Sequence, residues 1–153
     1  MYQTLIFYHS LLRWLVLLSL LCSILRAYKG YRQLAPVFNK TDNSVRHWTA
    51  TIAHIQLMAG ILLYTQSPAI AYFWANIQEA KHNLDNLFFA ILHIVLMLAA
   101  IVIITIGSAA AKRKSEDRAK FRTMLIWFSI ALLFILIAIP WPFSPLAQRP
   151  YIR

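Results

Sequence analysis

The 153-residue sequence predicts an all-α integral membrane protein: one domain, residues 1–153, in which four helices form an up-down-up-down bundle. Hydrophobic residues make up 60% of the chain and charged residues only 13%, whereas soluble domains average about 25% charged residues. The chain also contains four apolar runs, at about residues 4–25, 48–66, 87–107 and 124–140. Each is close to the length of about 20 residues that crosses a hydrocarbon core as a helix. Backbone groups in lipid must pair within their own segment, so helix is the expected state of each run.

The distribution of basic residues predicts how the bundle is oriented. The net charge is +10, and most of the Lys and Arg residues lie between runs one and two or between runs three and four. The second connection has Lys81 as its only Lys or Arg, and the C-terminal tail holds Arg149 and Arg153. By the positive-inside rule, both basic connections are cytoplasmic and both termini lie outside. The same residues serve better as topology determinants and lipid anchors than as a nucleic-acid site, so no nucleic-acid partner is expected.

The first run is expected to be a spanning helix and not a cleavable signal peptide. It is long enough to span, and it lacks a positively charged leading segment and a small-residue cleavage site. Cys22, the only cysteine, lies near the end of this run. A single cysteine excludes an intrachain disulfide and a cysteine metal cage.

The connections predict the remaining element boundaries. Asn43 or Ser44 is expected to cap the second helix. The outer connection, residues 67–86, contains the aromatic segment 72–74, which predicts a short interfacial helix. The third connection is short, which makes the third and fourth helices antiparallel neighbours. Pro140 and the prolines that follow it are expected to end the fourth helix.

Four ionisable residues lie inside the apolar runs: His9 and Arg13 in the first, His54 in the second and His93 in the third. Ionisable groups within a membrane span are costly, usually face the bundle interior and mark function. At 1.5 Å per residue, His9 and His93 lie roughly 8 and 9 Å below the outer boundary. Arg13 lies at about 14 Å and His54 at roughly 18 Å.

Two histidines at one level on diagonal helices can ligate a haem iron from both faces. We therefore expect His9 and His93 to be the axial ligands, with His54 as the alternate ligand. Arg13 is the expected partner of a haem propionate or of a quinone. The alternative is that His9 and His93 hydrogen-bond across helices while Arg13 pairs with backbone carbonyls.

Other functions remain open. His54, Met58, His93 and Met97 form a nitrogen and thioether set suited to Cu(I), which would indicate copper handling. The small size and the lack of a catalytic set also fit a cofactor-free structural subunit of a larger inner-membrane complex. There is no acidic dyad, no nucleophile with a neighbouring base and no glycine-rich phosphate loop, so an electron carrier or accessory subunit is favoured over a stand-alone enzyme.

The chain resembles the small four-span cytochrome b-like membrane proteins of Bacteroidetes. The resemblance extends over nearly the whole chain, at residues 9–14, 54–60 through Tyr64 and 67–68, 93–107 and 139–143. It implies a b-haem-type membrane protein. Together with the histidines, this makes a single-haem electron carrier of the bacterial inner membrane, exchanging electrons with quinone or a partner subunit, the leading hypothesis. The larger cytochrome b561 type carries two histidine pairs on four helices. This chain has no histidine in its fourth run, which leaves at most one such pair.

Overall fold

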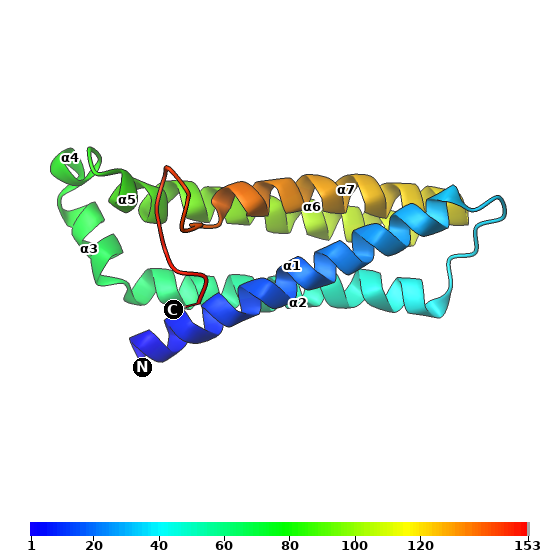
Figure 1. Cartoon of the computed structure of the whole chain (residues 1–153), viewed down its shortest axis with the longest axis horizontal. Helices are drawn as coiled ribbons and strands as arrows, with labels where there is room; N and C mark the ends of the chain where they lie inside the picture. The colour runs from blue at the N-terminus through cyan, green and yellow to red at the C-terminus, as the bar shows by residue number, and fades with distance from the viewer. Residues whose placement is uncertain (153) are drawn as a thin grey trace.

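The computed structural model describes residues 1–152, and every regular element in that part of the chain is helical. The long helices are α1 (Tyr2–Arg32), α2 (Lys40–Gln66), α6 (His93–Arg113) and α7 (Asp117–Ala138). Three short helices, α3 (Pro68–Ala75), α4 (Ile77–Ala80) and α5 (Leu84–Leu87), and a π-helical turn, η1 (Phe88–Leu92), lead from α2 to α6. Figure 1 shows the α1–α2 and α6–α7 connections at one end of the molecule, with both termini toward the other end.

Three helical segments among the described residues are long and apolar enough to cross a bilayer: Tyr2–Arg32, Leu84–Arg113 and Asp117–Ala138. These segments confirm the all-helical class and fit a multi-pass membrane protein. The second expected span, in α2, is not among them. Its first turns are charged and polar, and Thr49, Thr51, His54 and Gln56 interrupt its apolar part. α2 is therefore the most polar of the long helices.

The packing of the long helices places α1 and α6 at opposite corners. α1 contacts α2 and α7, and α6 contacts α7 and, less extensively, α2. The side chains of Leu20, Ile104 and Phe128 are fully buried in the core that these helices share. This arrangement puts the first and third predicted apolar runs diagonally across from each other.

Each of the three glycines allows a close contact between neighbouring helices. Gly30 of α1 lies against the ring of Phe121 on α7, so a Cβ atom there would overlap that ring. Gly107 of α6 lies equally close to Trp127 of α7. At Gly60 of α2, a Cβ atom would be 3.2 Å from Cε1 of His9.

The boundaries of α1 and α2 differ from those expected. α1 continues to Arg32, beyond the apolar run, and α2 begins at Lys40. The α2 cap is Asn39, not Asn43 or Ser44. The Asn39 side chain accepts a hydrogen bond from the Asp42 amide, and the Asp42 carboxylate accepts one from the Asn39 amide. This reciprocal capping box stabilises a helix start well before the apolar residues.

The expected short helix in the outer connection is α3, which contains the aromatic segment 72–74. Ser67 caps it and Pro68 occupies its first position, where the missing amide hydrogen costs nothing. Phe73 is buried, whereas Tyr72 and Trp74 are exposed. After α7, the tail folds back across the molecule toward the N-terminal part of α1, as the red trace in Figure 1 shows.

Candidate functional site

Two histidines from diagonal helices, His9 of α1 and His93 at the start of α6, come together between the long helices. Their ring centroids lie 6.5 Å apart, and their planes are inclined by 68°. The expectation from their similar depths was that they would meet, and the structure places them side by side. Their function as ligands remains a prediction.

The His93 ring is oriented by the end of α7. Its Nδ1 atom lies 2.8 Å from the carbonyl oxygen of Ala138. This carbonyl ends the helix, and its partner four residues on would be Pro142, which has no amide hydrogen. A carbonyl can only accept, so Nδ1 is the donor. In the neutral ring this leaves the lone pair on Nε2, the tautomer that histidine ligands use when their other nitrogen donates to a carbonyl.

Aromatic rings flank His93 on the side of η1. The centroids of Phe88 and Phe89 lie 5.8 and 6.1 Å from that of His93. Both phenylalanines belong to the π-helical turn that precedes it. Such turns are rare, and they occur frequently at functional sites.

His9 packs against α2. The side-chain amide of Gln56 donates to the backbone carbonyl of His9 at 2.9 Å, and its nitrogen lies 3.4 Å from Nε2 of His9. Gly60, one turn further along α2, leaves room for the edge of the His9 ring. Gln56 and Gly60 therefore position the imidazole from the same face of one helix.

Three polar atoms in this region are buried without a hydrogen-bond partner among the described residues: Nδ1 of His9, Oε1 of Gln56 and Nε of Arg13. Leaving such an atom unpaired costs about 1–3 kcal/mol. The three atoms belong to side chains that are in contact or one helical turn apart. Because these unpaired atoms are grouped in one region, a further group bound there would find hydrogen-bond partners.

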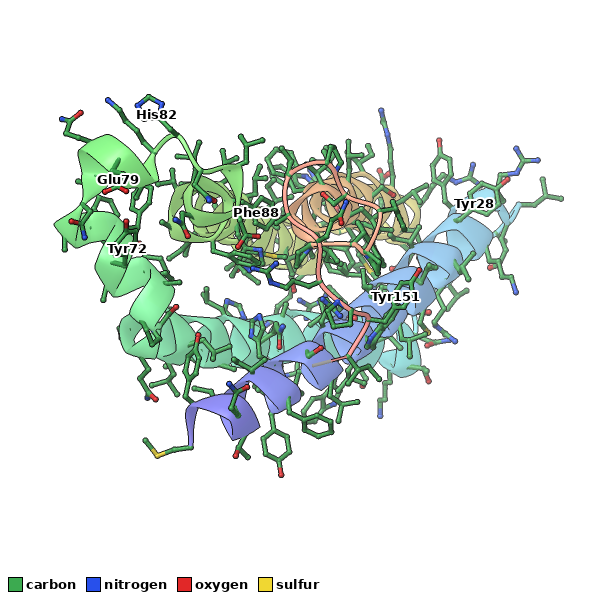
Figure 2. All side chains as sticks on the ribbon, turned by 60° about the vertical axis from the view of Figure 1, so that its left-hand side comes forward. Tyr28, Tyr72, Glu79, His82, Phe88 and Tyr151 are labelled. Atoms are coloured by element: carbon green, nitrogen blue, oxygen red, sulfur yellow. The ribbon has the colours of Figure 1, made fainter. Side chains whose placement is uncertain are left out.

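Arg13 points toward the C-terminal tail. Its guanidinium donates to the backbone carbonyl of Tyr151 and lies 3.5 Å from the Ser10 hydroxyl. The indole nitrogen of Trp14 donates to the same carbonyl at 3.2 Å. Figure 2 shows Tyr151 where the tail passes over α1. No carboxylate pairs with Arg13 in residues 1–152. Its guanidinium also lies over the ring of Trp14, 5.6 Å from the ring centroid.

The tail has a second attachment at Arg149. Its guanidinium contacts the Asp85 carboxylate at 2.5 Å and lies over the Phe89 ring, 4.8 Å from its centroid. Phe89 in turn flanks His93. The tail is thus held to α1 at one point and to the start of the α5–α6 segment at another, next to both site histidines.

His54 does not join the His9–His93 pair. It is exposed on α2, where its Nε2 lies 3.1 Å from the Thr105 hydroxyl of α6 and its Nδ1 lies 2.7 Å from the Ala50 carbonyl oxygen. His54, the expected alternate ligand, therefore lies apart from the pair, and its function as a ligand remains a prediction. His54 lies on a different face of α2, because Ala53 and Gln56 occupy the inward positions of the helix near this level.

The members of the expected copper set also lie in different surroundings. Met58 is 60% exposed, whereas Met97 packs against the hydrophobic core. Of the remaining histidines, His47 is exposed beside Trp48, and His82 is exposed in the outer connection, where Figure 2 shows it at the periphery. Within residues 1–152, no group of three or more His, Cys, Asp and Glu side chains could hold a metal ion.

Comparison with known proteins yields no match to a family model, to a curated protein or to a solved structure.

Sequence reasoning missed three residues that shape the site: Gln56, Ala138 and Tyr151. For Gln56 a signal was present, because it is a polar residue one turn before a glycine in an apolar run. Ala138 and Tyr151 contribute backbone carbonyls, which side-chain identity does not reveal. Pro142 was the only indication that the Ala138 carbonyl needs an external donor.

Proposed function

We propose that this chain is a four-span protein of the bacterial inner membrane, with its basic connections in the cytoplasm, that carries one b-type haem between His9 and His93 and transfers electrons to or from quinone or a partner subunit. The observation that carries the proposal is the pair of imidazoles 6.5 Å apart on diagonal helices. The resemblance to cytochrome b-like proteins supports the same function.

The donor set fits the group. Imidazole nitrogens bind transition metals at about 2 Å. With ring centroids 6.5 Å apart, His9 and His93 are close enough that they would hold the metal ion of one such group between them. His93 already has its Nδ1 hydrogen bond to the Ala138 carbonyl, which orients the ring and leaves Nε2 for the metal.

The other residues have supporting functions. Gln56 and Gly60 fix the position of His9 against α2. Arg13 is the cation nearest to the pair along α1, and its unpaired Nε provides a donor for a propionate or for a quinone oxygen. A bound haem would supply one-electron redox chemistry, with a potential set by its ligands, its burial and nearby charge.

A visible difference spectrum of the purified chain, reduced minus oxidised, tests the proposal. After haem-replete expression, we expect a b-type spectrum with one haem per chain. His9→Ala and His93→Ala should abolish it. The matched controls are His54→Ala and His82→Ala, which remove exposed histidines outside the pair and should retain it. A wild-type protein without a b-type spectrum would exclude this function.

A second candidate is a cofactor-free accessory subunit, and the surface of α2 favours it. His54 of α2 and Thr105 of α6 form an exposed polar pair, and contact of this pair with lipid would be costly. A larger membrane subunit covering the pair would remove that cost. Under this function, a partner co-purifies with the wild type and is lost in a His54→Leu/Thr105→Val variant, while His9→Ala leaves assembly unchanged.

A further inference from the structure

At the end of the molecule opposite the termini, an open cavity of about 480 Å³ lies between the starts of α2 and α7 and the end of α6. Its volume falls within the range of ligand pockets, about 300–1,000 Å³. We call it the lysine pocket, because ammonium groups from three helices line it. Its polar lining consists of Asn39, Lys40, Asn43, Ser44, Lys112 and Lys120.

Both asparagines are held with their amide nitrogens free to donate. The side-chain oxygen of Asn43 accepts from Nε and Nη2 of Arg46, at 3.2 and 2.9 Å. The side-chain oxygen of Asn39 accepts from the Asp42 amide. Because each oxygen is already engaged, the amide nitrogen is the group left to bind a ligand. The lining therefore presents hydrogen-bond donors selectively.

The rigid anchor for this arrangement is Arg46. Its side chain is 5% exposed and also donates to the backbone carbonyl and the hydroxyl of Ser108 on α6. A buried guanidinium held at both ends keeps Asn43 in one orientation. The pocket wall is thus preformed and does not depend on flexible lysines alone.

The charge of the pocket is not neutralised within the chain. No side chain lining it is acidic. Asp117, next to the pocket, pairs with Lys120 at 2.7 Å and accepts the Phe38 amide at 2.9 Å. Lys40 and Lys112 have no ion pair among residues 1–152. Two uncompensated ammonium groups and two amide donors remain around one space.

We infer that the lysine pocket binds a phosphate group, carried either by an anionic phospholipid or by a soluble phosphate. A phosphate offers acceptor oxygens to every donor in the lining, and its negative charge matches the two unpaired lysines. The pocket lies at the end of apolar helices, where a lipid headgroup would sit, and Phe38 adds an apolar wall. Basic pockets between membrane helices bind anionic headgroups by this chemistry.

The test uses the full chain in a neutral detergent, titrated separately with short-chain phosphatidylglycerol, phosphatidylcholine and inorganic phosphate. Native mass spectrometry measures the bound adducts, and the unfolding temperature measures the stabilisation that binding produces. We expect phosphatidylglycerol to bind more tightly than phosphatidylcholine. In Lys40→Gln/Lys112→Gln, the phosphatidylglycerol affinity should fall roughly 20-fold.

The matched control is Lys29→Gln/Lys114→Gln, which removes two exposed lysines from the same end of the molecule without altering the pocket. It should lower the affinity clearly less than the pocket pair does, because neither lysine lines the pocket. A second pair of variants adds a carboxylate at an exposed position, Ser44→Asp in the pocket and Ser115→Asp outside it. This pair also tests whether the loss of phosphatidylglycerol binding is specific to the pocket.

The separate lipid and phosphate titrations distinguish the source of the phosphate group. Selective loss of phosphatidylglycerol binding in the pocket variants supports a lipid headgroup. Saturable binding of inorganic phosphate that is lost in the same variants, with no lipid preference, supports a soluble phosphate. Equal losses in pocket and control variants, or no loss in either, would overturn the inference.

Discussion

Nδ1 of His93 donates a hydrogen bond to the carbonyl oxygen of Ala138, across 2.8 Å and between two helices. The bond satisfies a carbonyl that Pro142 cannot satisfy, and it aligns the imidazole that we propose as a haem ligand. His93 therefore has a structural role in this bond and a proposed role as a ligand, and two substitutions can separate the two.

His93→Asn should keep the structural role and lose the proposed role as a ligand. An asparagine amide can donate from about the position of Nδ1, whereas alanine leaves the carbonyl unpaired. We expect His93→Ala to lower stability by about 2–4 kcal/mol, through the lost bond and the cavity left by the ring. His93→Asn should cost clearly less. Both variants should lack the b-type spectrum. Thermal unfolding in detergent and the difference spectrum measure the two effects, and haem retained in His93→Asn would remove His93 from the ligand set.

Gly60→Leu should displace His9. Even a Cβ atom at Gly60 would come within 3.2 Å of Cε1 of His9, so a larger side chain must push the ring away from α2. We expect a loss of haem per chain of at least tenfold and a destabilisation of about 1–3 kcal/mol. Thr65→Leu, which places the same leucine side chain at an exposed position of the same helix, is the control and should retain full occupancy. Normal haem content in Gly60→Leu would show that the close contact with His9 is not needed.

Truncation after Gln148 should destabilise the site more than any single side-chain change in the tail. It removes the Tyr151 carbonyl from Arg13 and Trp14, and it removes Arg149 from Asp85. Tyr151→Ala is the matched control, because it keeps the carbonyl and loses only the phenol ring. We expect the truncation to cost about 1–3 kcal/mol, since it leaves a partly buried guanidinium without its main acceptor. Amide hydrogen exchange in residues 9–14 and the unfolding temperature measure the change. Equal effects of the two variants would show that the backbone contact is unimportant.

Arg46→Lys should be destabilising although it keeps the charge. The guanidinium forms one fork to Asn43 and another contact to Ser108, and an ammonium group cannot make both. We expect a loss of about 1–3 kcal/mol. The control is Arg26→Lys, since both hydrogen bonds of Arg26 go to one carboxylate oxygen of Asp42, a single acceptor that an ammonium group can also reach. The unfolding temperatures of the two variants, measured at one pH and salt concentration, compare their stabilities. Comparable losses of stability would show that the guanidinium contacts of Arg46 are not specifically required.

The sequence alone predicts the all-helical class and places His9 and His93 at one level, because both follow from run length and rise per residue. Of the four expected spans, only three are apolar enough to cross a bilayer among the described residues, since polar residues interrupt α2. The sequence does not predict where α1 ends and α2 begins. Those ends depend on the Asn39–Asp42 capping box, which continues α2 into polar sequence. The sequence also predicts the depth of His54 but not the direction in which its side chain leaves the α2 axis. That direction brings His54 to Thr105 and away from the His9–His93 pair. The tail contacts were not predictable, since they join Arg13 to a backbone group far along the chain.

The three glycine contacts have a consequence for how the molecule can move. Gly30 engages Phe121 between α1 and α7, Gly107 engages Trp127 between α6 and α7, and Gly60 engages His9 between α1 and α2. Each contact resists axial sliding, because a shift of one residue would bring a side chain where only a hydrogen atom fits. The α2–α6 seam has no such glycine contact, and its exposed polar pair is His54 and Thr105. Any opening of the bundle should therefore occur along this seam, as a hinge that swings α2 outward while the heights of the two site histidines stay the same.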